Sequence, residues 1–101
     1  MAPVCDFCSS PEVVWRYPAH NFIAYVIGDI AGQSVGDWAA CPACKALIEA
    51  GDRVGLADRS AALLITANPE MASAKDELVG ELMSLQAMFF ANQCGQAVAV
   101  V

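Results

Sequence analysis

The chain has 101 residues, a formal net charge of −6 and a hydrophobic fraction of 57%. This length suits one domain whose modest core needs reinforcement, and the negative charge disfavours nucleic acid, whose binding depends on neutralising phosphates. The apolar runs at residues 22–27 and 61–67 are far shorter than the roughly 20 residues of a membrane span. Because the first residues also lack the features of a signal peptide, we expect a cytoplasmic protein that does not enter a membrane.

The N-terminal part begins with a Cys-x-x-Cys pair, Cys5 and Cys8, and is predicted to continue as β structure. Residues 13–17 are rich in β-branched and aromatic side chains, which predicts a short strand. A second strand is expected at residues 20–27, joined to the first by an antiparallel turn that begins at Pro18. Several glycines then indicate a loop or wide hairpin, followed by a short run that leads to the next cysteine.

A second Cys-x-x-Cys pair, Cys41 and Cys44, opens a predicted helix. Residues 45–50 are good helix formers, and Gly51 is a typical residue after a helix end. The dipole of a helix stabilises thiolates near its N-terminus, which favours metal binding and redox reactivity equally. The helix alone therefore does not separate a metal site from a redox site.

The C-terminal half is predicted to be helical. Asp58 or Ser60 is expected to cap a short helix, and Asn68 with Pro69 marks the start of a long helix over residues 69–92. Apolar side chains recur on the long helix at spacings of three and four and form one stripe of Met71, Ala74, Leu78, Leu82, Leu85 and Phe89. What remains of the polar face near its end is Glu81, Ser84 and Gln86.

The two cysteine pairs together predict a structural metal site. Each pair supplies two ligands through a two-residue knuckle, and two knuckles fill the four positions of a tetrahedral zinc ion. We therefore expect one structural Zn2+ per chain, bound by Cys5, Cys8, Cys41 and Cys44. Because a saturated four-cysteine site leaves no position for a substrate, we expect no enzymatic activity.

Two other uses of the cysteines stay open. The Cys-Pro-Ala-Cys segment at residues 41–44 resembles the dithiol of glutaredoxin-like proteins, although the βαβ pattern of those proteins is absent. Both pairs together in an acidic protein also resemble rubredoxins, which bind iron and transfer electrons, but Ser9 and Lys45 stand where rubredoxins have glycine. A redox or electron-transfer protein is therefore the first alternative to a zinc protein.

The order of knuckle, hairpin, second knuckle and helix resembles a treble-clef zinc finger over residues 5–51. The predicted fold class is α+β, with a treble-clef or zinc-ribbon-like hairpin module followed by two helices, the last one long. The module is expected in residues 1–55, and residues 56–101 are expected to form a helical extension that packs on it as part of one cooperative domain.

Four segments also resemble small uncharacterised bacterial proteins, many of them actinobacterial, and phage-borne proteins with paired knuckles. They are CDFCSSP at residues 5–11, WRYPA at 15–19, GDWAAC at 36–41 and IEAGDR at 48–53. The resemblance implies a bacterial or phage setting and two retained cysteine knuckles, without an activity that could be transferred to this chain.

Several single side chains have simple expected roles. Cys94 is expected to be a packing residue, and His20 is expected not to bind the metal. Trp15 and Trp38 should be at least half buried near the site, because a small zinc domain has few other apolar groups for its core. Arg16, Arg53 and Arg59 could bind an anion, but ion pairs with nearby acidic residues are the simpler expectation.

The hydrophobic fraction exceeds the roughly 45–50% usual for globular chains and predicts an additional apolar surface. We expect it on the C-terminal helix, at Leu82, Met83, Leu85, Phe89 and Phe90. The leading hypothesis is thus a zinc-stabilised protein-interaction module, such as a dimeric regulator or adaptor, that binds a protein partner or a second copy. A nucleic-acid-binding zinc finger, the further alternative, needs Arg16, Lys45 and Arg53 to converge on one face.

Overall fold

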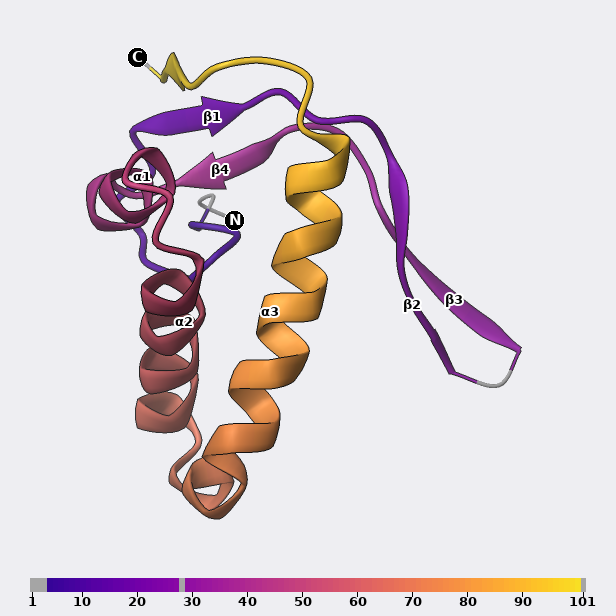
Figure 1. Cartoon of the computed structure of the whole chain (residues 1–101), viewed down its shortest axis with the longest axis vertical. Coiled ribbons are helices and arrows are strands. Elements are labelled where there is room, and N and C mark those ends of the chain that lie inside the picture. Colours follow the sequence, from indigo (N-terminus) through magenta and orange to yellow (C-terminus); the bar gives the residue numbers. More distant parts are fainter. Residues whose placement is uncertain (1–3, 28, 101) are drawn as a thin grey trace.

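The computed structural model describes residues 4–27 and 29–100 and has an α+β fold, as the sequence predicts. In chain order its elements are β1 (Trp15–Tyr17), β2 (Phe22–Ile27), β3 (Ile30–Ser34), β4 (Trp38–Ala40), α1 (Pro42–Glu49), α2 (Arg53–Ala67), the 3₁₀ helix η1 (Pro69–Ala74), α3 (Lys75–Asn92) and β5 (Val98–Ala99). Helices α2 and α3 stand side by side below β1 and β4, and the β2–β3 hairpin projects away from them (Figure 1).

Strand β1 is the centre of a small antiparallel sheet. It pairs with β4 on one edge and with the short C-terminal strand β5 on the other. Trp15 lies opposite Ala40 in β4 and opposite Ala99 in β5. The sheet therefore joins three distant parts of the chain, and both edges of β1 are used.

The prediction that β1 and β2 are antiparallel neighbours joined by a turn is wrong. The segment that connects the two strands runs beside the end of α3 instead: the His20 backbone N–H donates to the Asn92 carbonyl (2.8 Å), and the Cys94 N–H donates to the Pro18 carbonyl (2.9 Å). Because β4 and β5 occupy both edges of β1, β2 has no place beside it. Strand β2 pairs with β3 in a separate two-stranded sheet.

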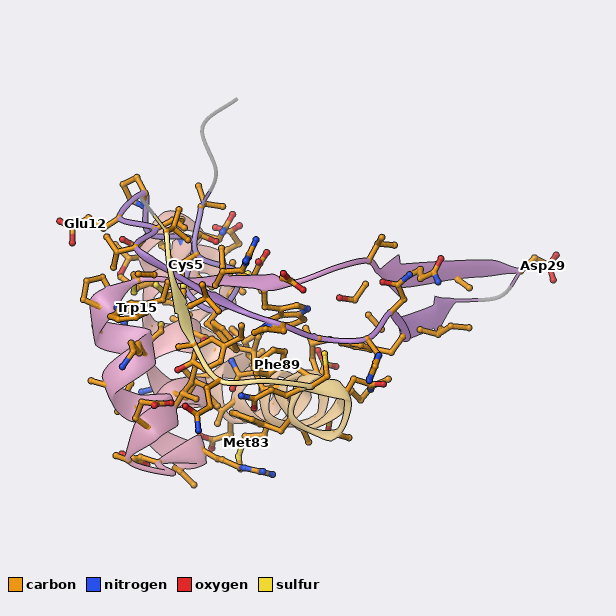
Figure 2. The ribbon with its side chains drawn as sticks, turned by 90° about the horizontal axis from the view of Figure 1, so that it is seen from above. Cys5, Glu12, Trp15, Asp29, Met83 and Phe89 are labelled. Carbon is orange, nitrogen blue, oxygen red and sulfur yellow. The ribbon has the colours of Figure 1, made fainter. Side chains whose placement is uncertain are left out.

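The wide hairpin expected after residue 27 is present, with β3 as its return strand. Phe22 pairs with Ser34 at the base, and the register shifts between Ile23 and Tyr25. Seen from above, Asp29 lies at the far end of the hairpin, well away from the body of the molecule (Figure 2). At the base, the Trp38 indole N–H donates to Ser34 Oγ (2.8 Å), which ties the hairpin to β4. Gly28 lies outside the described residues.

Helix α1 follows the second knuckle directly and ends where the sequence predicts. Its last residue is Glu49, and Gly51 adopts a φ of +71°, a left-handed conformation that is far easier for glycine than for other residues. The turn that contains Gly51 points the chain into α2 within a few residues, so α1 and α2 pack against each other.

Helix α2 begins earlier than predicted, and its cap is Asp52 rather than Asp58 or Ser60. The Asp52 Oδ1 atom accepts a hydrogen bond from the Gly55 N–H (2.8 Å), and a Cβ at position 55 would collide with that carboxylate. Ser60 lies in the middle of the helix, where its hydroxyl donates to the Leu56 carbonyl (2.9 Å). The earlier start turns the predicted short helix into one of 15 residues.

The predicted long helix over residues 69–92 is present, but its first six residues form the 3₁₀ helix η1 before α3 begins at Lys75. Asn68 does not cap it through its side chain. The Asn68 Nδ2 atom donates instead to the Leu64 carbonyl (3.1 Å) at the end of α2. Among the helices of the described residues, none combines the length and the apolar character that a membrane span requires.

One hydrophobic core joins the cysteine knuckles, the sheet and the helices. Its largest fully buried side chains are Tyr17, Phe89 and Leu56, which come from β1, α3 and α2. Figure 2 shows Phe89 in the middle of the molecule. The boundary expected between residues 55 and 56 lies inside α2, and residues on both sides of it contribute to the same core.

Gln86 was expected on the polar face of α3, and this expectation is wrong. Its side chain is buried and its Nε2 atom donates to Ser60 Oγ of α2 (2.9 Å). Since the Ser60 hydroxyl in turn donates to the Leu56 carbonyl, a short polar chain links α3 to α2 inside the core. The other two residues of the expected polar face, Glu81 and Ser84, are exposed.

Replacing Tyr17 by phenylalanine should lower the free energy of unfolding by about 1 kcal/mol at neutral pH. The Tyr17 side chain is buried and its hydroxyl donates to Glu49 Oε2 (2.9 Å). Burial raises the pKa of Tyr17 above its usual value, and the hydrogen bond to Glu49 raises it further.

The folded chain therefore holds the Tyr17 proton to a higher pH than the unfolded chain, and the stabilisation from Tyr17 is lost as pH rises above about 10. Urea unfolding of wild type and Tyr17→Phe at neutral and alkaline pH measures this difference. If the gap between the two proteins does not narrow at alkaline pH, the hydroxyl does not act as described.

Candidate metal centre

Pairing between β1 and β4 brings the two cysteine knuckles together. The first knuckle precedes β1, and the second follows β4 directly. Asp6, inside the first knuckle, clamps the two: its N–H donates to the Ala39 carbonyl (2.9 Å), and its Oδ2 accepts from the Ala39 N–H (2.6 Å). The strand that leads into Cys41 is thereby fixed against the turn that carries Cys5 and Cys8.

The first knuckle is a tight backbone turn. The Ser9 N–H donates to the Cys5 carbonyl (2.8 Å), and the Cys5 N–H donates to the Ser10 carbonyl (2.8 Å). To close this turn Ser9 adopts a φ of +66°, the left-handed conformation that disfavours residues with a Cβ. No corresponding strain arises at Lys45 after the second knuckle, because that residue continues α1.

Ser9→Gly should therefore raise the free energy of unfolding by about 0.5–1 kcal/mol, since glycine removes the strain at a modest cost in chain entropy. Ser9 is exposed, so few side-chain contacts are lost. Ser9→Val, which places a β-branched side chain in the same conformation, should destabilise the protein. Chemical denaturation of the metal-saturated proteins checks both, and a Val variant as stable as the Gly variant would rule out backbone strain at this position.

The four cysteine sulfurs lie close enough to bind a single metal ion. The Sγ atoms of Cys5, Cys8, Cys41 and Cys44 are all within 4.8 Å of one another, and those of Cys8 and Cys41 are 3.6 Å apart. Tetrahedral zinc, with Zn–S bonds of about 2.3 Å, sets neighbouring sulfurs about 3.8 Å apart. All four cysteines are buried and free of disulfides. The cluster predicted from the sequence is therefore confirmed, and its size fits a tetrahedral ion.

Backbone N–H groups point at the first sulfur of each pair. The Phe7 N–H lies 3.4 Å from Cys5 Sγ, and the Cys44 N–H lies 3.5 Å from Cys41 Sγ. The second contact makes Cys41 the N-cap residue of α1. Donors to sulfur favour the thiolate over the thiol, and the thiolate is the form that binds metal.

The thiols influence one another's protonation. A hydrogen bond with Cys44 lowers the pKa of Cys5, and the same hydrogen bond is the main reason that the pKa of Cys44 is raised. Burial raises the pKa of Cys8. Without a metal, the cluster thus keeps protons on some sulfurs. Metal uptake must displace these protons, so metal binding should weaken as pH falls.

Arg59 is a site residue that sequence reasoning missed. Its Nη2 atom lies 3.8 Å from Cys8 Sγ and 3.9 Å from Cys41 Sγ, whereas an ion pair with a nearby acidic residue was expected. Burial lowers the pKa of Arg59, but hydrogen bonds with Cys44 and Cys41 and the neighbouring thiol charges together outweigh burial and raise it above its usual value, so the guanidinium remains charged. No sequence motif indicates this contact, since it depends on how α2 packs beside the knuckles.

The remaining candidates occupy ordinary positions. His20 lies outside the cysteine cluster, as expected, and is exposed. Cys94 also lies outside the cluster, but the expectation that it is a packing residue is wrong, because its side chain is exposed after the end of α3. Trp38 is buried and Trp15 is at least half buried, which confirms the expectation for both. The Trp38 and Phe7 rings lie 5.1 Å apart, so the aromatic core directly adjoins the first knuckle.

The other basic side chains contact groups within the chain. Arg16 pairs with Asp37 (3.2 Å), which confirms the ion-pair expectation for this residue. Arg53 lies over the Phe90 ring, and Lys45 lies over the Trp15 ring, each 4.4 Å from the ring centre. The three cations proposed for a nucleic-acid surface thus have separate intramolecular partners.

The residues expected at a partner surface differ in exposure. Leu82, Met83, Leu85 and Phe90 are partly exposed, whereas Phe89 is completely buried. Phe89 therefore belongs to the core of this chain and offers no surface to a partner. In Figure 2 Met83 lies at the periphery, at a distance from the central Phe89.

We compared the chain with protein-family models, curated proteins and solved structures, and none of them matched. The resemblance to bacterial and phage-borne proteins with paired knuckles therefore gains no support from these comparisons. What identifies the site is its own geometry, four buried cysteines that converge within metal-binding distance.

Proposed function

We propose that this chain is a non-enzymatic protein-interaction module whose fold is held together by one zinc ion bound to Cys5, Cys8, Cys41 and Cys44. The observation that carries the proposal is the convergence of four buried sulfurs within 4.8 Å. Four thiolates complete a tetrahedral zinc shell and leave no open position for a substrate or a water, so the metal stabilises the fold without catalysing a reaction.

Burial of the sulfurs also favours a structural role over redox chemistry. The four cysteines are between 0% and 7% exposed, and thiol–disulfide exchange requires an accessible thiolate. We place the protein in the cytoplasm, where thiols are kept reduced and available to metals.

Metal analysis of protein purified without added zinc tests this proposal. We expect about one zinc per chain, no visible absorption, and four thiols that react with a thiol reagent only after a chelator removes the metal. Visible absorption with stoichiometric iron would favour the electron-transfer alternative. Reversible disulfide formation without metal loss would support a redox protein and overturn the structural role.

The interaction surface that we propose is the apolar side of α3 next to α2. Leu82 is partly exposed on α3, and Leu63 and Leu64 on α2 are 38% and 36% exposed. Leu63, Leu64 and Leu82 line one shallow cavity of about 200 Å³ together with Phe7 of the first knuckle. This surface suits a second copy of the chain or another protein, and the zinc site keeps its parts in place.

Light scattering of wild type and Leu64→Asp tests self-association through this surface, because Leu64 lines the cavity and is 36% exposed. Ser84→Asp is the control, because Ser84 is exposed on α3 and does not line the cavity. A dimer mass for wild type and the control, with a monomer mass for Leu64→Asp, supports a homodimer. A monomer mass for all three proteins would eliminate self-association and leave a different protein as the partner.

A further inference from the structure

Arg59 covers one edge of the cysteine cluster. It projects from α2, and its Nη2 atom lies 3.8 Å from Cys8 Sγ and 3.9 Å from Cys41 Sγ, the pair of sulfurs that are themselves 3.6 Å apart. Cys8 is the most exposed of the four cysteines, at 7%, compared with 1% for Cys41. The guanidinium thus lies beside the most exposed cysteine of the cluster.

The position of Arg59 is costly unless the sulfurs are negatively charged. Its Nε is buried and has no hydrogen-bond partner among the described residues, so this side chain gives up solvation in order to reach the cluster. Neutral thiols are weak hydrogen-bond acceptors, so they would not offset this loss of solvation. Four thiolates around one dication carry a net charge of about −2, which a guanidinium beside the sulfurs partly neutralises.

Three other basic side chains contact groups other than the cluster sulfurs. Arg16 pairs with Asp37, and Lys45 and Arg53 lie over aromatic rings. Compared with these three residues, Arg59 is the one whose charge acts on the sulfurs. Its two contacts are made to one cysteine from each knuckle, so the guanidinium also bridges the two halves of the site.

We propose that Arg59 is a positioning residue of the metal centre, which neutralises and shields the edge between Cys8 and Cys41 and thereby slows loss of the metal. The inference rests on the proposed zinc site. Groups in contact with metal ligands commonly change metal affinity by about 10–100-fold when they are removed, because they hold the ligands in their charged form and orientation.

The test compares Arg59→Met with Arg59→Lys and with Arg16→Met, the last being a control that removes the same charge at a distance from the site. The zinc-loaded proteins are mixed with a chromogenic chelator and the rate of zinc transfer is measured. We expect transfer from Arg59→Met to be roughly tenfold faster or more than from wild type. Arg59→Lys should lie between the two, and Arg16→Met should match wild type.

A second measurement separates an electrostatic role from simple packing. In the Co2+-substituted proteins, loss of the guanidinium should move the thiolate-to-cobalt charge-transfer band to longer wavelength, because the sulfur electrons are less stabilised. Arg59→Lys should restore part of the shift. If Arg59→Met fails to fold, the same comparison is made with Arg59→Lys and Arg59→Gln, whose bands should then differ.

The outcomes distinguish the two proposals. A wild-type protein that binds no zinc contradicts the proposed metal centre itself. A wild-type protein that binds zinc, with Arg59 variants that match Arg16→Met in transfer rate and charge-transfer energy, overturns the role of Arg59 and leaves the metal centre standing.

Discussion

Cys44→Ser will leave the protein largely unfolded under conditions in which the wild type is folded. Cys44 is completely buried at the start of α1, and its sulfur belongs to the four-sulfur cluster. Structural zinc sites in small domains supply apparent binding free energies of about 10–16 kcal/mol, whereas whole domains are stable by only about 5–15 kcal/mol. Loss of one ligand should therefore remove most of the stability of a 101-residue chain.

Cys94→Ser is the matched control, since it makes the same chemical change at an exposed cysteine outside the cluster. We expect it to retain wild-type zinc content and a wild-type melting temperature. Circular dichroism and metal analysis of both variants measure the difference. A Cys44→Ser protein with full zinc content and an unchanged melting temperature would contradict the structural role of the cluster.

Phe89→Ala should cost about 3–5 kcal/mol of unfolding free energy, the range for removal of a fully buried aromatic side chain. Phe89 is completely buried, and its ring lies between 4.9 and 6.0 Å from those of Phe7, Tyr17, Trp38 and Phe90. It thus joins α3 to the first knuckle and to the sheet. A cavity at this position therefore removes contacts with the first knuckle and with both β1 and β4.

Phe90→Ala is the natural comparison, because Phe90 is the next residue on α3 but remains partly exposed. Its loss should cost roughly half as much or less, since a partly buried ring transfers less apolar area. Urea unfolding of the zinc-saturated proteins, followed by tryptophan fluorescence, measures both values. Equal losses for the two variants would show that Phe89 is not the centre of the core.

The parts of the fold that could be predicted from the sequence are those encoded locally. Cysteine spacing identified the four cysteines of the site, because the ligand chemistry depends on residue type and the knuckle requires only two intervening residues. The end of α1 at Gly51 and the long helical stretch to residue 92 were likewise marked by residues at the element itself.

What could not be predicted depends on contacts between distant segments. The pairing of β1 with β5 joins Trp15 to Ala99, and a strand of two residues has no recognisable pattern of its own. Gln86 is polar and fits a solvated face, yet it is buried because Ser60 offers a partner across the α2–α3 contact. Arg59 acquires its role only when α2 packs beside the knuckles.

One missed feature did leave a local signal. Asp52 directly follows Gly51, the glycine after the end of α1. It lies three residues before Gly55, from whose N–H its side chain accepts a hydrogen bond. The sequence therefore could have predicted an N-cap at this position. The predicted caps, Asp58 and Ser60, are also typical capping residues, but they lie in the interior of α2. Candidate caps are therefore best ranked by their distance from the preceding helix end.

The most direct test of a structural zinc site is a titration of the purified protein with a high-affinity chelator, in which zinc release and far-ultraviolet circular dichroism are recorded on the same sample. The proposed zinc site predicts one zinc per chain, released in parallel with loss of helical signal, and recovery of both when zinc is added back. Complete zinc release with an unchanged spectrum, or a folded protein that never contained metal, would contradict the claim that this cluster holds the fold together.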